Sequence, residues 1–371
     1  MKPLLITQGD PAGVGPEICA ACAVKEMVNP TDAPIAVLGS AALLKKAAEY
    51  SVAPADMPIF DSIPVVPYRE FAAGAVADSP VQIVDFDNVD MTAHAPGRIC
   101  AEYGQASFDY IKSAIDWTLE GLGTSHARGE DKVLLPKKSV LALPTSNQEP
   151  TLSAGVVTGP IHKVALHLAG VPFPGHTEMF AHYTGAKKIC MVLSSSELTT
   201  ALVTAHVGYS DVPKLITRER VWETLEINRA AWRKILDREP RFTVCGLNPH
   251  AGENGLFGNR EEELAIAPAV EQAKQAGYNI VGPIPPDTAF IPSRRMQTDV
   301  YICMYHDQGL IPMKAFGFDT GINITLGLPI VRTSVDHGTA MDIAFGSTPG
   351  VKPSSLSMTS AIKLARKLSN S

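Results

Sequence analysis

The sequence has little cysteine, few aromatic side chains and no long apolar run. Only 6% of its 371 residues are aromatic, and its six cysteines are dispersed at positions 19, 22, 100, 190, 245 and 303. Scattered cysteines among apolar neighbours indicate free thiols in a reducing compartment. No apolar run approaches the roughly 20 residues that a membrane helix requires, and the N-terminal segment becomes polar too soon for a signal peptide. We therefore predict a soluble, cytoplasmic protein with no membrane partner.

The sequence also lacks an excess of basic residues. Its 32 Lys and Arg are outnumbered by 38 Asp and Glu, and the formal net charge is -6 at pH 7. A general nucleic-acid-binding surface is therefore not expected, although a local basic pocket for a small anion is compatible with this charge. With 45% hydrophobic residues, the chain is long enough for a sizeable core and for two subdomains.

Two short motifs are better explained by packing than by chemistry. Cys19 and Cys22 have the spacing of a redox or zinc site, but they lie in a helix-like run and no second CxxC pair completes a four-thiolate site. A glycine-containing segment, residues 8–18, follows the first predicted strand, yet its glycines do not match GxGxxG and it lacks a GK[ST] ending. We interpret it as a packed strand-to-helix turn.

Apolar runs of strand length alternate with helix-like segments, which is the pattern of an α/β fold. The predicted strands cover residues 4–7, 35–38, 81–85, 155–158, 188–193, 199–204, 242–245 and 300–304. The predicted helices cover residues 41–50, 105–122 and 217–236. Residues 123–152 mix charge clusters with prolines and show no sustained period. We interpret them as an inserted arm or surface loop.

The densest group of polar residues lies between positions 300 and 345. An apolar strand is expected to deliver His306, Asp307 and Gln308 to a turn at Gly309. Cationic and amide donors suited to an anionic substrate follow, and an arginine can grip a carboxylate or phosphate through two parallel hydrogen bonds. These donors are Lys314, Asn323 and Arg332. Each residue taken singly is more often structural or solvated, and only their density favours a binding site.

Three histidines each follow the end of a predicted strand. They are His206, His250 and His306, and open α/β sheets place their sites in loops beyond strand ends. Three imidazoles can hold a divalent metal with positions left open for substrate, while structural hydrogen bonding is the alternative for each. A Pro-rich turn also precedes His176 and Thr177. Both can bond a substrate oxygen, and Thr177 can equally be a helix cap.

Eight segments follow one another along the chain. They are TQGDPAGVGPEI, VVTGPIHK, PFPGHTE, TAHV, VCGLNPHAGENGLFG, GPIPPDT, MYHDQGLIPMKAFGF and NITLGLPIVRTSVDHGTAMDIA. Taken together and in this order, they closely resemble the 4-hydroxythreonine-4-phosphate dehydrogenase family of vitamin B6 biosynthesis, from the N-terminus to about residue 345. Within the last segment, HGTAMDIA is similar to the adenosine-binding loop of the isocitrate and isopropylmalate dehydrogenases.

The resemblance implies a two-domain α/β fold like that of the isocitrate and isopropylmalate dehydrogenases, with the active site in the interdomain cleft. Residues 1–155 together with 300–371 would form the first α/β domain, on the cofactor side. Residues 156–299 would form the second, on the substrate, metal and dimer side. The resemblance further implies a homodimer in which metal ligands come from both chains.

The resemblance also assigns roles to individual residues. His206, His250 and His306 would be metal ligands, with zinc as the first expectation and magnesium, manganese or cobalt as substitutes. The substrate-binding residues would be His176, Thr177, Lys314, Asn323 and Arg332. Asp307 and Lys314 are the candidates for a catalytic role, Asp307 either as general base or as a residue that orients a metal ligand. The cofactor NAD would contact His337, Gly338 and Asp342.

The implied reaction is the NAD- and metal-dependent oxidation and decarboxylation of 4-phosphohydroxy-L-threonine to 3-amino-2-oxopropyl phosphate, a step of pyridoxine biosynthesis. The family includes paralogues, so D-threonate 4-phosphate, D-erythronate 4-phosphate or an aromatic cis-dihydrodiol carboxylate is the alternative substrate. Two other classes stay open from the residues alone. One is a hydrolase with a three-histidine zinc site, and the other is a non-catalytic binding protein built on a dehydrogenase fold.

Overall fold

The computed structural model describes residues 2–31, 33–120 and 153–369. Contacts divide them into two compact units. Unit 1 contains the chain up to Ala186 and again from Leu328 onward, and unit 2 contains Lys187–Gly327. The arm predicted at residues 123–152 lies outside the described residues.

Unit 1 is built on a parallel sheet. Its strands are β1 (Leu4–Thr7), β2 (Ile35–Gly39), β3 (Val65–Pro67), β4 (Val81–Asp85), β5 (Gly155–Thr158) and β12 (Arg332–Val335). They are ordered β3-β4-β2-β1-β5-β12, and each neighbouring pair is parallel. Every residue of β1, β2, β5 and β12 is buried. Burial on both faces explains why β1, β2 and β5 read as nearly continuous apolar runs. β12 is equally buried, although three of its four residues, Arg332, Thr333 and Ser334, are polar.

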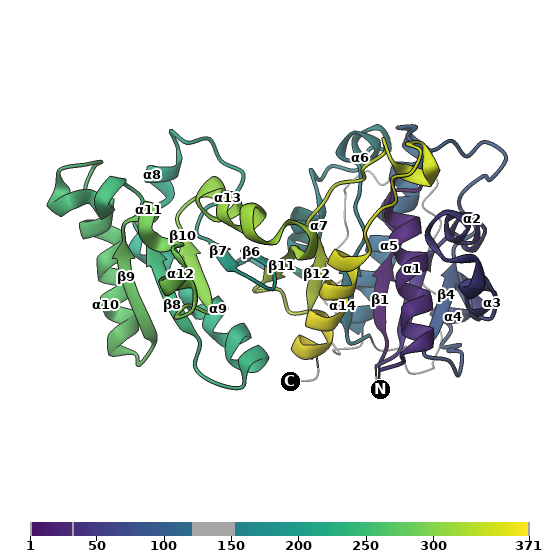
Figure 1. The fold of residues 1–371 in the computed structure, drawn as a ribbon, viewed down its shortest axis with the longest axis horizontal. Helices are drawn as coiled ribbons and strands as arrows, with labels where there is room; N and C mark the ends of the chain where they lie inside the picture. The colour runs from purple at the N-terminus through teal and green to yellow at the C-terminus, as the bar shows by residue number, and fades with distance from the viewer. Residues whose placement is uncertain (1, 32, 121–152, 370–371) are drawn as a thin grey trace. The chain divides into compact units, whose positions relative to one another are not determined.

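Helices cover both faces of the unit 1 sheet. They are α1 (Gly15–Val28), α2 (Ala41–Ser51), α3 (Met57–Asp61), α4 (Tyr68–Ala72), α5 (Ala101–Glu120), α6 (Lys163–Leu168), α7 (His176–Thr184) and α14 (Leu356–Ser369). α1 and α14 lie side by side (Figure 1). α5 buries Phe108, Ile111, Ile115 and Leu119 in a core that also contains Leu5 and Val156 of the sheet. This confirms the apolar helical face predicted for residues 105–122, as far as the structure describes it.

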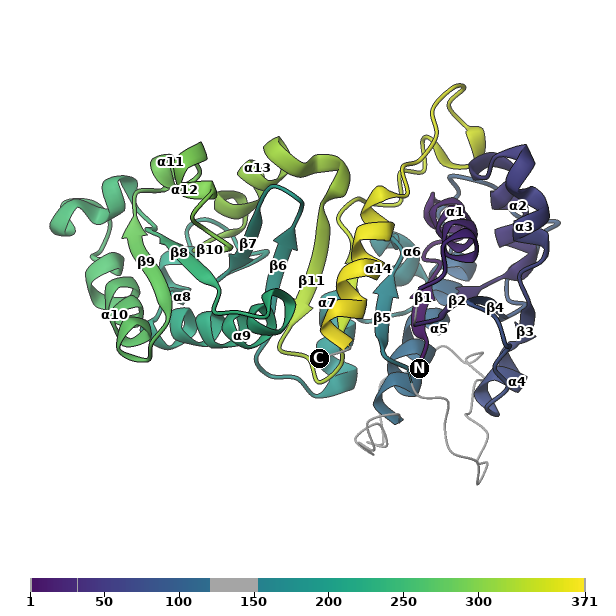
Figure 2. The same cartoon turned by 60° about the horizontal axis from the view of Figure 1, so that its bottom comes forward.

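Unit 2 has a mixed sheet. Its strands are β6 (Cys190–Ser194), β7 (Thr199–Leu202), β8 (Arg241–Cys245), β9 (Asn279–Ile284), β10 (Val300–Cys303) and β11 (Ile322–Leu326). They are ordered β11-β6-β7-β10-β8-β9. The pairs of β6 with β11 and with β7 are antiparallel, and β7, β10, β8 and β9 run parallel. Figure 2 shows β6 and β7 as a hairpin beside β11.

The helices of unit 2 include the long helix predicted near residues 217–236. They are α8 (Val212–Leu215), α9 (Arg218–Leu236), α10 (Ala267–Gln275), α11 (Pro286–Ala289), α12 (Pro292–Arg295) and α13 (His306–Gly317). α13 was not expected, because the sequence suggested a turn at Gly309. An added Cβ at Gly309 would lie 2.8 Å from Leu202 Cδ2 and 3.2 Å from Thr200 Cβ. Gly309 therefore serves close packing of α13 on β7, not a turn.

Strand pairing also sets the bounds of the two units. These bounds differ from the division that the resemblance implied, in which the domains changed at residues 155 and 300. β5 pairs with β1 and β12, so the chain stays in unit 1 through α7. β10 pairs with β7 and β8, so the chain stays in unit 2 until Gly327. Within the described ranges, no helix is both long and apolar enough to cross a membrane.

The two motifs assigned to packing behave as predicted. Cys19 and Cys22 are 1% and 2% exposed and are free thiols. Burial raises the pKa of the Cys22 thiol to about 11, which keeps it protonated and unreactive. In the first loop, Gly9 has φ +79° and Gly15 packs against the backbone of Gln8. The segment is therefore a packed turn, as the sequence indicated.

Candidate functional site

The three predicted metal-ligand histidines all follow parallel strands of unit 2. Leu202 at the end of β7 pairs with Cys303 at the end of β10, and β10 pairs in turn with β8. His206, His306 and His250 come after these three strand ends. Because parallel strands end at the same edge of a sheet, this topology gathers the histidine-bearing segments at one edge.

Two buried side chains join these segments. The Thr204 hydroxyl donates to the Met304 carbonyl at 2.7 Å and so joins the segments that carry His206 and His306. The Met304 N–H donates to Gln308 Oε1 at 2.7 Å, and Gln308 Nε2 donates to the Gly246 carbonyl at 2.8 Å. Gln308 therefore joins the segments that carry His306 and His250. Its role was not recognised from the sequence, because a lone glutamine carries no spacing signal.

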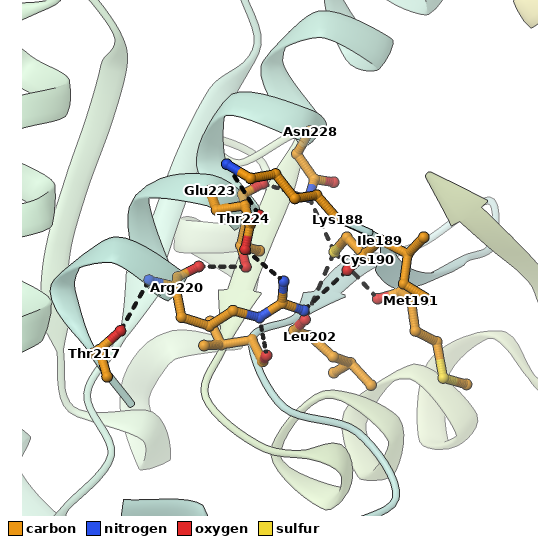
Figure 3. A network of polar contacts seen from close by, with 11 residues as sticks. Lys188, Ile189, Cys190, Met191, Leu202, Thr217, Arg220, Glu223, Thr224 and Asn228 are labelled. Atoms are coloured by element: carbon orange, nitrogen blue, oxygen red, sulfur yellow. Dashed lines mark hydrogen bonds and ion pairs between the residues drawn. The ribbon is translucent and has the colours of Figure 1, made fainter. Parts of the chain in front are cut away.

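The strand edge behind His206 is fixed by Arg220, near the start of α9 (Figure 3). Arg220 Nε donates to the Val203 carbonyl at 3.0 Å, and Nη2 donates to the Ile189 carbonyl at 2.9 Å. Its Nη1 pairs with Glu223 at 3.0 Å. Val203 directly follows β7, so the guanidinium holds α9 against the segment that leads to His206.

His250 lies in a loop of unusual backbone conformation. Residues from His250 to Asn254 all have positive φ, with 53° at His250 and 57° at Asn254. The buried carboxylate of Glu262 supports the preceding backbone, because its Oε1 accepts from the N–H groups of Leu247 at 2.8 Å and Asn248 at 2.7 Å. The His250 ring lies 6.1 Å from the ring of Phe257, centroid to centroid. Backbone strain of this kind concentrates at functional sites.

His206 and His306 form a pair suited to metal binding. Their ring centroids are 5.5 Å apart, and His306 Nδ1 lies 2.7 Å from Asp307 Oδ1. A histidine with one ring nitrogen on a carboxylate presents the other as a ligand, which is the usual arrangement in metal sites. Among the residues that the structure describes, however, no group of three or more His, Cys, Asp or Glu is placed to hold a metal ion. The ring contact brings together two of the predicted ligands, His206 and His306.

Asp307 has both carboxylate oxygens engaged. Oδ1 contacts His306, and Oδ2 accepts from the Tyr209 hydroxyl. The Tyr209 hydrogen bond first and the His306 contact second hold the pKa of Asp307 below its ordinary value. A carboxylate occupied in this way is better suited to orienting His306 than to accepting a substrate proton. Tyr209 was not identified from the sequence.

The two remaining candidates of unit 2 lie on α13 and β11. Lys314 is exposed on α13, with Nζ 5.6 Å from the centroid of the Phe318 ring. Asn323 lies on β11 opposite Leu193 of β6 and is partly buried. Both positions are accessible from solvent, as a substrate-binding role requires.

A second group of predicted residues comes together in unit 1 around Arg332. This side chain is only 3% exposed, and its Nη2 donates to Thr158 Oγ1 at 3.0 Å. Burial lowers the pKa of Arg332 to about 9, while nearby Glu178 opposes the shift, so the guanidinium stays protonated at neutral pH. A buried cation of this kind favours binding of an anion. Thr158 was read from the sequence only as the end of a strand.

His176 lies beside this cation at the start of α7. Burial first and Arg332 second lower the pKa of His176 well below its ordinary value, so the imidazole is neutral at physiological pH. Its Nε2 is buried without a hydrogen-bond partner among the described residues, and is therefore available to a ligand. Thr177 is not the helix cap, since that position belongs to Gly175, which leaves the Thr177 hydroxyl free of capping.

The predicted cofactor residues follow β12 in unit 1. His337 Nδ1 lies 2.9 Å from the Gly338 carbonyl, and Asp342 is exposed. The loop rests on the first loop of the chain, because the Val14 N–H donates to the Thr339 carbonyl at 2.9 Å. An added Cβ at Gly13 would lie 2.6 Å from that carbonyl oxygen. The loops after β1 and β12 thus support each other at the carboxyl ends of parallel strands, where such folds bind ligands.

Asp10 in the first loop is a buried carboxyl, 1% exposed. Its Oδ1 accepts from the Ala12 N–H at 2.9 Å, and its Oδ2 is buried with no partner among the described residues. Burial raises the pKa of Asp10 from 3.8 to about 6, against the opposing effect of the Ala12 hydrogen bond. The folded protein therefore binds more protons than the unfolded chain between these two pH values.

A pH-dependent stability follows from this excess. The free energy of unfolding should fall as pH rises from about 4 to about 6, because folding there opposes ionisation of Asp10. Asp10→Asn should remove this fall, which amounts to about 3 kcal/mol for a pKa raised by about two units. Denaturant unfolding of both proteins at several pH values measures the difference. Asp90→Asn is the control, since hydrogen bonds from Thr92 lower the pKa of that carboxylate. Parallel curves for wild type and Asp10→Asn would refute the assignment.

A family model described as pyridoxal phosphate biosynthetic protein PdxA matches residues 145–365. The chain belongs to this family. A 4-hydroxythreonine-4-phosphate dehydrogenase from Desulforapulum autotrophicum is 36% identical over 361 residues, which cover 97% of this chain and 93% of that protein. A D-threonate 4-phosphate dehydrogenase from Salmonella typhimurium is 34% identical and covers 99% of both chains.

A solved structure extends the agreement from PdxA-family sequence to fold. The crystal structure of 4-hydroxythreonine-4-phosphate dehydrogenase from Klebsiella pneumoniae matches with a TM-score of 0.73 and 33% identity, covering 100% of both chains. The predicted family and the α/β fold class are therefore confirmed. The prediction of an oxidoreductase is confirmed as well, because these PdxA-family relatives are dehydrogenases.

Proposed function

We propose that this chain catalyses the NAD- and metal-dependent oxidation and decarboxylation of 4-phosphohydroxy-L-threonine to 3-amino-2-oxopropyl phosphate, in cytoplasmic pyridoxine biosynthesis. The observation that carries the proposal is its chain-long similarity to a 4-hydroxythreonine-4-phosphate dehydrogenase, at 36% identity over 97% of the chain. It is supported by a buried guanidinium beside a neutral imidazole in unit 1. Cationic recognition of this kind suits a substrate that carries both phosphate and carboxylate.

D-threonate 4-phosphate is the second candidate substrate. The observation in its favour is the D-threonate 4-phosphate dehydrogenase from Salmonella typhimurium, 34% identical over 99% of this chain. The two substrates share a phosphate and a carboxylate and differ in the amino or hydroxyl group beside the carboxylate. Arg332 and Lys314 attract both compounds alike, so charge alone does not separate them.

Each predicted residue has a defined task in this proposal. Arg332 and Lys314 neutralise the anionic groups of the substrate, and Asn323 fixes its orientation. His176 and Thr177 add hydrogen bonds, for which the buried Nε2 of His176 is suited. Asp307 holds His306 through the Nδ1 contact at 2.7 Å. NAD, which accepts the hydride, is held by His337, Gly338 and Asp342.

The histidines are proposed to bind a divalent metal, zinc first, with magnesium, manganese or cobalt as alternatives. The ion would supply Lewis-acid polarisation of the substrate alcohol oxygen. His206 and His306 fit this role, because their ring centroids are 5.5 Å apart and His306 is oriented by Asp307. We propose that the ligand set, His250 included, is completed in a homodimer.

The test is an assay of NADH formation by the metal-replete, full-length protein. 4-Phosphohydroxy-L-threonine, D-threonate 4-phosphate, D-erythronate 4-phosphate and a cis-dihydrodiol carboxylate are supplied in parallel with NAD. Turnover of the first compound, abolished by a chelator and restored by metal, is the expected result. Turnover of only one of the other compounds would instead assign the protein the oxidation of that compound. If none of the four compounds is turned over and fluorescence detects no NADH binding, a dehydrogenase is rejected. A hydrolase or a non-catalytic binding protein would then be favoured.

A further inference from the structure

A chain of polar contacts joins Tyr209, Asp307 and His306 in unit 2. The Tyr209 hydroxyl donates to Asp307 Oδ2, and Asp307 Oδ1 lies 2.7 Å from His306 Nδ1. One carboxylate thus bridges a phenol and an imidazole, using a different oxygen for each. A carboxylate held at both oxygens loses the rotational freedom it would have if only the imidazole contacted it.

The contact joins two segments far apart in sequence. Tyr209 lies three positions after His206, in the segment that follows β7. Asp307 lies in the first turn of α13, next to His306. The hydrogen bond therefore connects the segment that carries one predicted ligand to the helix that carries the other. The ring centroids of those two histidines are 5.5 Å apart.

Besides the hydrogen bond of its hydroxyl, Tyr209 has a contact with a neighbouring aromatic ring. Its ring stands edge-on to that of Tyr305, with centroids 5.7 Å apart and an interplanar angle of 79°. The side chain is otherwise 67% exposed. Removing the hydroxyl would leave the ring contact and the hydrophobic core unchanged, so any effect would come from the hydrogen bond to Asp307 and not from unfolding.

Resting on the proposed metal role of His306, we propose that Tyr209 is a positioning residue that orients the His306 imidazole through Asp307. With Nδ1 held by the carboxylate, Nε2 of His306 is the nitrogen presented to a metal. The Tyr209 hydroxyl keeps the carboxylate turned so that its other oxygen faces the ring. Tyr209 touches neither substrate nor cofactor in this role.

The experiment measures Co²⁺ affinity of the full-length protein by visible absorption, in competition with a chelator. The variants are Tyr209→Phe, Asp307→Asn, their double variant and His306→Ala, and Tyr50→Phe is the matched control in unit 1. Tyr209→Phe should weaken Co²⁺ binding roughly tenfold, the lower end of the effect of groups that orient metal ligands. In the Asp307→Asn background, the same change should have no further effect, because the hydroxyl acts only through that carboxylate.

Each outcome separates this proposal from the proposed metal site. If His306→Ala binds Co²⁺ as tightly as wild type, the metal site is wrong and the role of Tyr209 is rejected with it. If His306→Ala loses Co²⁺ while Tyr209→Phe matches Tyr50→Phe, only the role of Tyr209 is rejected. Equal losses from Tyr209→Phe in both backgrounds would also reject it, since the hydroxyl would then act independently of Asp307. Thermal midpoints confirm that each variant is folded.

Discussion

Replacing Arg332 by lysine should raise the KM for the phosphorylated substrate roughly 100-fold, because a buried guanidinium that binds an anion through two hydrogen bonds loses several kcal/mol when its planar fork is removed. The burial is severe, with only 3% of the side chain exposed. Thr158 holds one end of the guanidinium at 3.0 Å, so the native geometry is preset. The change should affect substrate binding much more than the KM for NAD.

The same substitution should create a new pH dependence. Burial lowers the pKa of Arg332 to about 9, and the guanidinium is still charged at neutral pH. The ordinary pKa of lysine is about two units below that of arginine. The same burial should therefore bring the pKa of a lysine at this position close to neutral pH. The KM of Arg332→Lys should therefore increase more than the KM of wild type as pH rises from 6 to 8. Arg218→Lys is the control, since Arg218 is exposed and its guanidinium bonds to Gln272. A KM equal to that of wild type across this range would refute the assignment.

Removing His306 should abolish both metal binding and turnover. We expect His306→Ala and His206→Ala to purify with little divalent metal and to lower kcat at least roughly 1000-fold, because a bound ion stabilises a developing oxygen anion by several kcal/mol. His250→Ala should behave in the same way if the proposed ligand set is correct. Metal content by elemental analysis and steady-state kinetics provide the two measurements.

The control for the histidine variants is His167→Ala, because His167 is exposed on α6 in unit 1. It should retain metal and activity. Excess zinc or cobalt should not rescue His306→Ala fully, whereas it should restore wild type after chelation. Full activity of His306→Ala at wild-type metal content would refute a ligand role. Retention of metal by His250→Ala alone would restrict the site to His206 and His306.

Local structure was accessible from the sequence wherever one pattern dominated. The strands at β1, β4 and β10 were predicted within one residue of their observed ends, because short, largely apolar runs of strand length indicate buried strands. The helix α13 was missed. Its Gly309 suggested a turn, and only the close approach of Leu202 explains the glycine.

The candidate site was partly accessible. The residue types came from the sequence and from its resemblance to a known family, since histidines after strand ends suggest a metal and a spaced arginine suggests an anion. The contact partners of these residues could not be predicted from the sequence. Thr158 lies 174 positions from Arg332, and Gln308 lies 62 positions from Gly246. Contacts over such distances depend on the order of strands, which no local period encodes.

The sequence by itself determined the family, the α/β alternation and the identities of the polar residues, because composition and short-range spacing follow directly from the chain. Only the tertiary structure decided which of those residues meet. It brought His206 to His306, Arg332 to Thr158 and Tyr209 to Asp307. The reason is physical: side chains contact one another through strand pairing and helix packing, which join segments that share no local pattern.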